Sequence, residues 1–162
     1  MKKSKNRNKF YLAYGSNLNL EQMSHRCPYA IPLGPSVLPG YRLLFRGSME
    51  NSVATIEPFE SGIVPVLLWE ITPRDEEALD SYEAWPRLYR KETVEVMLND
   101  KLVEAMVYIM NEGYQLGSPN KFYYKTILEG YDSAGLDYAV LTEAVRYSCG
   151  NEARFRYITG GC

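Results

Sequence analysis

Metal ligands and disulfide-forming residues are scarce in this sequence. It holds one histidine, His25, and three cysteines, Cys27, Cys149 and Cys162. Structural zinc sites need four such ligands at close, regular spacings, which these residues do not supply, so we expect no bound metal. An odd number of widely spread cysteines also argues against a disulfide framework and is typical of a reducing compartment. We therefore expect a cytoplasmic protein.

Long apolar runs and a strong net charge are also missing. No stretch reaches the roughly 18 apolar residues of a membrane span, and no apolar segment of a secretory signal follows the basic N-terminus. The net charge of −2 creates no field that would draw the chain to nucleic acid or a membrane, so we expect neither partner. The basic residues from Lys2 to Lys9 predict a solvated, disordered tail over residues 1–9.

The remaining sequence is typical of one α+β domain. A chain of 162 residues favours a single domain, which we place at residues 10–148, with a C-terminal tail over 149–162. Strand patterns dominate early and helical patterns cluster late, which predicts a small mixed β-barrel-like sheet with flanking helices. The expected strands cover residues 10–14, 41–45, 53–56, 63–71, 92–98 and 101–110, and the expected helices cover 20–27, 73–83, 118–129 and 138–148.

Three further features of the sequence support these elements and indicate a pocket. Alternating apolar residues flank Asn99-Asp100 and predict a hairpin, because both residues tolerate the positive φ angles of a type I′ turn. Thr72, followed by Pro73 and Asp75, predicts a helix start with Thr72 as the N-cap. Tyrosine is abundant, with 14 residues, and a subset of them could line a polar pocket.

The segment from Tyr14 to Asn19 is the first candidate site. An apolar strand ends in Gly-Ser-Asn, and a short helix follows with Asn19 as N-cap and Gln22 placed for a capping box. Such a loop directs successive backbone N–H groups into one concavity, which can bind a carboxylate or a polarised carbonyl. From the pattern alone, a strand followed by glycine and asparagine is more often a plain turn, which is the alternative interpretation.

Glu83 is the second candidate. It ends the helix predicted to begin at Pro73, where the negative end of the helix dipole disfavours an ionised carboxyl. If the neighbouring Tyr82 and Trp85 exclude water, the pKa of Glu83 rises further. An acid of this kind can accept and return a proton near neutral pH. A solvated glutamate at a frayed helix end is the alternative interpretation.

Together these segments resemble the γ-glutamylcyclotransferase family, which includes AIG2-like and butirosin-pathway cyclotransferases. The resemblance extends over roughly residues 10–148 and depends most on Tyr14-Gly15-Ser16-Asn17-Leu18, Leu79-Asp80-x-x-Glu83 and Tyr89. Members of the family have a compact mixed β-barrel with flanking helices. They release 5-oxoproline from γ-glutamyl amines or peptides without a cofactor. The family often has glycine directly after the catalytic glutamate, where this chain has Ala84.

The resemblance implies a role for each candidate residue. Glu83 would be the catalytic acid/base, acting on a small-molecule γ-glutamyl substrate with no cofactor and no metal. The implied substrate-binding residues are Tyr14, Gly15, Ser16, Asn17, Leu18, Asn19, Tyr89 and Tyr108. Two alternatives remain open from the sequence. One is a non-catalytic module that binds a small molecule or a protein on the same fold, and the other is a hydrolase with Ser16 as nucleophile and His25 as base.

Overall fold

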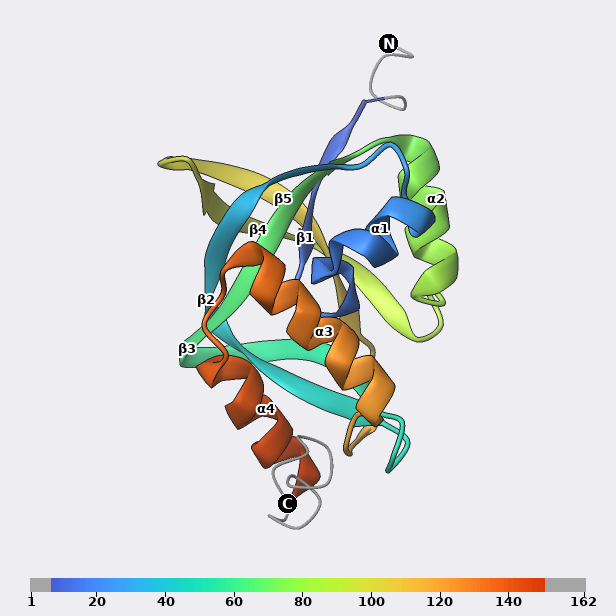
Figure 1. Cartoon of the computed structure of the whole chain (residues 1–162), viewed down its shortest axis with the longest axis vertical. Coiled ribbons are helices and arrows are strands. Elements are labelled where there is room, and N and C mark those ends of the chain that lie inside the picture. Colours follow the sequence, from blue (N-terminus) through green and yellow to red (C-terminus); the bar gives the residue numbers. More distant parts are fainter. Residues whose placement is uncertain (1–6, 151–162) are drawn as a thin grey trace.

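A curled sheet flanked by helices makes up residues 7–150, which are the residues described by the computed structural model of the chain (Figure 1). The strands are β1 (Lys9–Ala13), β2 (Ile31–Gly47), β3 (Val53–Ile71), β4 (Tyr89–Leu98), β5 (Lys101–Met110) and β6 (Gln115–Leu116). The helices are α1 (Leu20–Arg26), α2 (Pro73–Tyr82), α3 (Lys121–Ala134) and α4 (Ala139–Cys149), and a 3-10 turn, η2 (Ser16–Leu18), follows β1. The predicted α+β class is confirmed.

The sheet is mixed and bends toward closure. Its strand order is β4-β5-β1-β3-β2-β6, and β1 in its interior pairs parallel with β5 and antiparallel with β3. The hydroxyl of Ser36 on β2 donates to the carbonyl oxygen of Met97 on β4 at 2.6 Å. This contact brings the start of β2 close to the end of β4, so the sheet curls into the predicted barrel-like shape.

The strands β2 and β3 are longer than the sequence predicts. The strands predicted over 53–56 and 63–71 form one continuous β3, and the strand predicted over 41–45 is the end of β2. Pro58 does not end β3, because it stands opposite Tyr41, where a register shift already interrupts the ladder. A second shift lies between Pro32 and Gly34. These irregularities let the long hairpin bend around the core.

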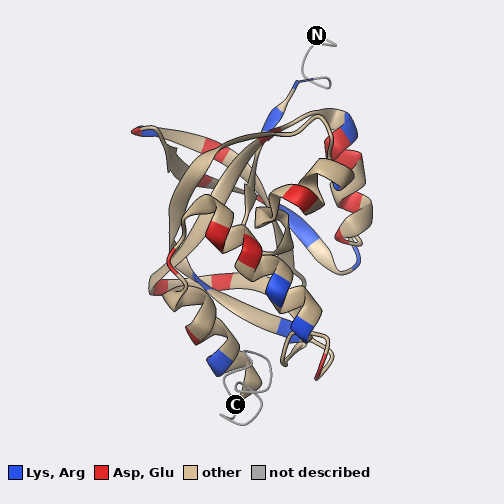
Figure 2. Cartoon of the chain, viewed as in Figure 1, with Lys and Arg blue, Asp and Glu red and all other residues tan. Residues whose placement is uncertain are grey.

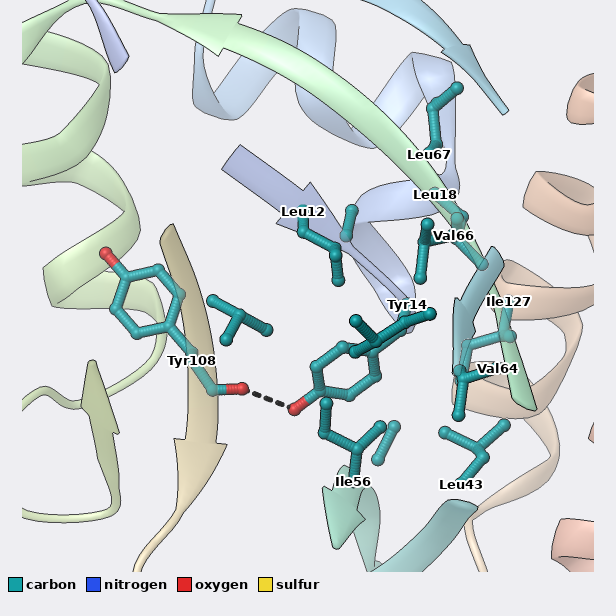
Figure 3. Close-up of a cluster of buried hydrophobic side chains, with 14 of the residues drawn as sticks. Leu12, Tyr14, Leu18, Leu43, Ile56, Val64, Val66, Leu67, Tyr108 and Ile127 are labelled. Atoms are coloured by element: carbon teal, nitrogen blue, oxygen red, sulfur yellow. Dashed lines mark hydrogen bonds between the residues drawn. The ribbon is translucent and has the colours of Figure 1, made fainter. Parts of the chain in front are cut away.

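The hydrophobic core joins the sheet to α3. Figure 3 shows buried side chains of β1, β2, β3 and β5 packed together with Ile127 of α3. Leu12 of β1 and Ile127 are both fully buried. The Tyr14 ring lies in the same cluster, and its hydroxyl donates to the carbonyl oxygen of Tyr108 at 2.6 Å. The core therefore fixes the point at which β1 ends and the candidate loop begins.

The helix α3 begins later and extends further than predicted. Its N-cap is Asn120, whose side chain accepts the backbone N–H of Tyr123, and it continues through Gly130 to Ala134. A Cβ atom at Gly130 would lie only 2.6 Å from the Cβ of Leu18. Gly130 therefore marks a close crossing between α3 and η2, whereas Gly135, with a φ of 69°, ends the helix.

The other local predictions agree with the structure. Asn99 and Asp100 have φ angles of 50° and 66°, as a type I′ hairpin turn requires. Thr72 and Asp75 form a reciprocal capping box at the start of α2. The strand β1 begins at Lys9, one residue before the predicted strand. Most of the two predicted tails, at residues 1–6 and 151–162, lies outside the described residues.

Figure 2 shows both acidic and basic residues scattered over the helices and strands of the described chain. Within residues 7–150, none of the helices combines the length and the apolar character needed to cross a membrane.

Replacing Gly130 with alanine tests the close crossing of α3 and η2. We expect Gly130→Ala to lower the free energy of unfolding by about 1–3 kcal/mol, because the added methyl group must displace Leu18. At an ordinary helix position the same change would stabilise the protein by roughly 1 kcal/mol. Urea unfolding measures the difference, with Asp132→Ala on the exposed face of α3 as the control. A stabilised Gly130→Ala variant would contradict the crossing.

Candidate active site

The loop after β1 presents backbone N–H groups at the start of a 3-10 turn. The N–H groups of Leu18 and Asn19 donate to the carbonyl oxygens of Gly15 and Ser16. Ser16 and Asn17 are the first residues of η2, and their own N–H groups have no acceptor within the turn. A Cβ at Gly15 would lie 3.1 Å from the Cβ of Ala54. A glycine is therefore what lets the backbone pass this close to β3.

Two residues of the predicted loop lie behind it. Leu18 is fully buried against α3. The Asn19 side chain accepts the backbone N–H of Gln22 at 3.0 Å, as predicted for an N-cap, and donates to the carbonyl oxygen of Thr126 at 3.0 Å. The Gln22 side chain accepts from Arg26 instead of completing the expected capping box. Leu18 and Asn19 thus anchor the loop and do not line the cavity described next.

Glu83 follows directly after the last residue of α2. Its backbone N–H donates to the carbonyl oxygen of Leu79 at 2.8 Å, and its Oε1 accepts a long contact of 3.4 Å from the Asn17 amide nitrogen. The next residue, Ala84, has a φ of 50° and turns the chain out of the helix. The C-terminus of α2 therefore directs the Glu83 carboxyl at the loop after β1, 66 residues earlier in the sequence.

Residues of both segments line one cavity of about 260 Å³. This cavity brings together Glu83 and six of the predicted binding residues: Tyr14, Gly15, Ser16, Asn17, Tyr89 and Tyr108. The remaining lining residues were not predicted from the sequence: Tyr11, Val53, Ala54, Tyr82, Leu88 and Tyr123. The abundance of tyrosine indicated that some would line a pocket, but no local pattern indicated which ones.

The lining tyrosines are held by hydrogen bonds of their hydroxyl groups. Tyr89 donates to the carbonyl oxygen of Ala54 at 2.5 Å, and Tyr123 accepts the N–H of Ala54 at 3.0 Å. The Tyr108 hydroxyl donates to Asp80 at 2.6 Å. Tyr82 is 42% exposed, but its hydroxyl forms a hydrogen bond with Ser16 Oγ at 2.8 Å. These bonds fix the shape of the cavity.

Comparison with known proteins identifies the family of the chain. The family model for gamma-glutamyl cyclotransferase, AIG2-like, matches residues 11–131. The chain belongs to this family. No curated protein matches the chain by sequence.

Solved structures of similar proteins share the cyclotransferase fold. A structure named gamma-glutamyl cyclotransferase is 26% identical over 80% of this chain and 82% of its own, with a TM-score of 0.74. An uncharacterized human protein is 27% identical over 80% of this chain and 81% of its own, with a TM-score of 0.73. A yeast gamma-glutamyl cyclotransferase specific to glutathione has the same fold, at 13% identity over 94% of this chain and 96% of its own and a TM-score of 0.61.

The position after Glu83 explains a preference of the cyclotransferase family. Ala84 adopts a left-handed backbone conformation, which glycine reaches without the steric penalty of a Cβ atom. Glycine after the glutamate therefore suits the turn that ends α2.

Burial raises the pKa of Glu83 from its ordinary value of 4.5 to about 7, and the positive charge of Arg26 opposes part of this rise. The water-excluding groups are the cavity tyrosines and not Trp85, which is 42% exposed and packs over the Nζ of Lys91. A carboxyl with a pKa near 7 exchanges a proton readily at neutral pH. Within residues 7–150, no group of three or more His, Cys, Asp or Glu side chains could hold a metal ion.

The raised pKa predicts how Glu83 affects stability. Between pH 4.5 and about 7 the folded state retains a proton that the unfolded state has lost, so stability falls as the pH rises. Glu83→Gln should therefore raise the free energy of unfolding by up to roughly 3 kcal/mol at pH 8 and by little at pH 4. Urea unfolding at several pH values measures this, with Glu77→Gln on exposed α2 as control. If Glu83→Gln raised the free energy of unfolding by the same amount at every pH, Glu83 would not retain its proton in the folded state as inferred.

Proposed function

We propose that this protein is a γ-glutamyl cyclotransferase that releases 5-oxoproline and a free amine from a small γ-glutamyl amide, with Glu83 as the general acid/base. The observation that carries the proposal is the position of Glu83. Its carboxyl has a pKa of about 7 and lies in the wall of the same small tyrosine-lined cavity as the loop residues Ser16 and Asn17. Family membership supports the same reaction class.

The reaction needs only an intramolecular attack. The α-amine of the γ-glutamyl group attacks its own δ-carbonyl carbon, and Glu83 takes the proton that the amine releases as the new C–N bond forms. The cavity contributes by holding the glutamyl chain in a folded conformer, which removes rotational freedom before the reaction. A small enclosed site is well suited to this task.

The tetrahedral intermediate then collapses to products. Its oxyanion would accept hydrogen bonds from the backbone N–H groups of Ser16 and Asn17, a type of stabilisation that is often the largest single contribution to catalysis. Glu83 returns its proton to the leaving nitrogen, the original amide C–N bond breaks, and 5-oxoproline and the amine are released. Proton and bond changes balance without a metal, a nucleotide or a covalent enzyme intermediate, and we place the reaction in the cytoplasm.

Removing the proton acceptor tests the proposal directly. We expect Glu83→Gln to lower 5-oxoproline release from a panel of γ-glutamyl amines and dipeptides by at least about 100-fold, because the amide cannot accept the proton. The wild-type kcat/KM should fall about tenfold per pH unit below pH 7, where Glu83 is protonated. Glu77→Gln serves as the matched control.

Two results would contradict this role. Near-normal turnover by Glu83→Gln would remove Glu83 as the acid/base. Saturable binding of γ-glutamyl compounds by the wild-type protein, with no 5-oxoproline formed from any of them, would indicate a binding module on the cyclotransferase fold.

The hydrolase alternative makes a different prediction. Ser16 Oγ bonds the Tyr82 hydroxyl, while His25 is exposed and lines a separate groove beside α1. We therefore expect Ser16→Ala to lose no more than about tenfold in activity, less than Glu83→Gln, because the proposed donors are backbone groups. EDTA should leave the activity unchanged. A covalent adduct on Ser16 detected by mass spectrometry, or inhibition by EDTA, would support the hydrolase or a metal-dependent reaction.

A further inference from the structure

Arg26 lies next to the cavity but does not line it. It is in the last turn of α1, and its guanidinium stacks on the Tyr82 ring with 3.4 Å between its Cζ atom and the ring centroid. One guanidinium nitrogen donates to the side-chain oxygen of Gln22 at 2.9 Å, and another donates to the side-chain oxygen of Asn17. Among residues 7–150 no carboxylate forms an ion pair with Arg26 within 4.0 Å.

The contact with Arg26 determines which way the Asn17 amide faces. A guanidinium can only donate hydrogen bonds, so the atom of Asn17 that meets it must be the carbonyl oxygen Oδ1. The amide nitrogen Nδ2 then faces the opposite side, where it donates to the Tyr11 hydroxyl at 2.9 Å and contacts Glu83 Oε1 at 3.4 Å. A reversed amide would place a carbonyl oxygen against the Glu83 carboxyl and repel its ionised form.

We propose that Arg26 is a positioning residue, which acts through Asn17 to hold the Glu83 carboxyl in the orientation and ionisation state that proton transfer requires. This inference rests on the proposed cyclotransferase function. Arg26 does not touch the cavity, so its effect passes through the Asn17 amide and through its own charge. Its stacking on Tyr82 and its bond to Gln22 hold it in place for both effects.

The charges around Glu83 support this role. Burial raises the pKa of Glu83, and Arg26 is the charged group that lowers it. The other titratable groups that line the cavity with Glu83 are six tyrosines: Tyr11 on β1, Tyr14 after β1, Tyr82 on α2, Tyr89 on β4, Tyr108 on β5 and Tyr123 on α3. A tyrosine hydroxyl carries no positive charge in either of its protonation states. Burial also raises above the ordinary range the pKa of five of these residues: Tyr11, Tyr14, Tyr89, Tyr108 and Tyr123. The positive charge of Arg26 therefore has no substitute among them.

Two substitutions separate the charge of Arg26 from its geometry. Arg26→Met keeps much of the side-chain length but removes the charge and the donors, so the acidic limb of the kcat/KM profile should move upward by roughly half to one pH unit. We also expect kcat at the new optimum to fall about tenfold. Arg26→Lys keeps the charge, so its acidic limb should stay near the wild-type position while kcat falls. Arg87→Met, at an exposed position four residues after Glu83, controls for the loss of one positive charge.

A measurement without substrate keeps this inference separate from the proposed function. The carboxyl carbon of Glu83, labelled with ¹³C and assigned by its loss in Glu83→Gln, reports the titration by NMR. An upward shift of this titration in Arg26→Met but not in Arg87→Met would support the role of Arg26 even if no γ-glutamyl compound were turned over. If both the titration and the pH profile of a folded Arg26→Met variant match the wild type, the positioning role is wrong. Melting temperatures of all the variants show that each is folded.

Discussion

Asn17 connects four elements of the structure around the candidate site. Its amide nitrogen contacts Tyr11 of β1 and Glu83 after α2, its side-chain oxygen accepts from Arg26 of α1, and its backbone carbonyl accepts from the Trp69 indole of β3 at 3.2 Å. The residue is almost entirely buried, with 2% exposure. Buried polar groups are stable only when their hydrogen bonds are made, so the relative positions of these four elements depend on this residue.

Burial of the Glu83 carboxyl lowers the stability of the folded state at neutral pH and, at the same time, raises the pKa of this group to about 7. A carboxyl that keeps its proton up to about pH 7 weakens the folded state at neutral pH, because the unfolded chain ionises freely. The same environment brings the pKa of Glu83 close to neutral pH, where the proposed reaction would transfer a proton to and from this carboxyl. The tyrosine hydroxyls bond the backbone, Asp80, Ser16 and Asn17, so the cavity around Glu83 keeps its shape without further charges.

Local chemistry predicted the parts of this site that depend on short segments. The loop at Gly15 and the helix end at Glu83 each depend on a few adjacent residues, and both form where the sequence predicts them. The same is true of the hairpin turn at Asn99-Asp100, which lies outside the site. The prediction that the helix ends at residue 129, just before Gly130, is wrong. In the sequence, a glycine that permits a close helix crossing looks the same as one that ends a helix. Only the tertiary contact with Leu18 distinguishes the two.

The residues that the sequence did not indicate come from segments far apart along the chain. Tyr11 and Tyr123 lie more than 100 positions apart, and no periodicity links either of them to Glu83. Arg26 is less visible still, because an arginine in the last turn of a helix is an ordinary surface pattern that also suits the helix dipole. The contacts of its guanidinium with Asn17 and Tyr82 form only when α1 packs against η2 and α2 in the folded chain. A short motif thus indicates the proposed acid/base, while the residues that surround it are determined by the fold.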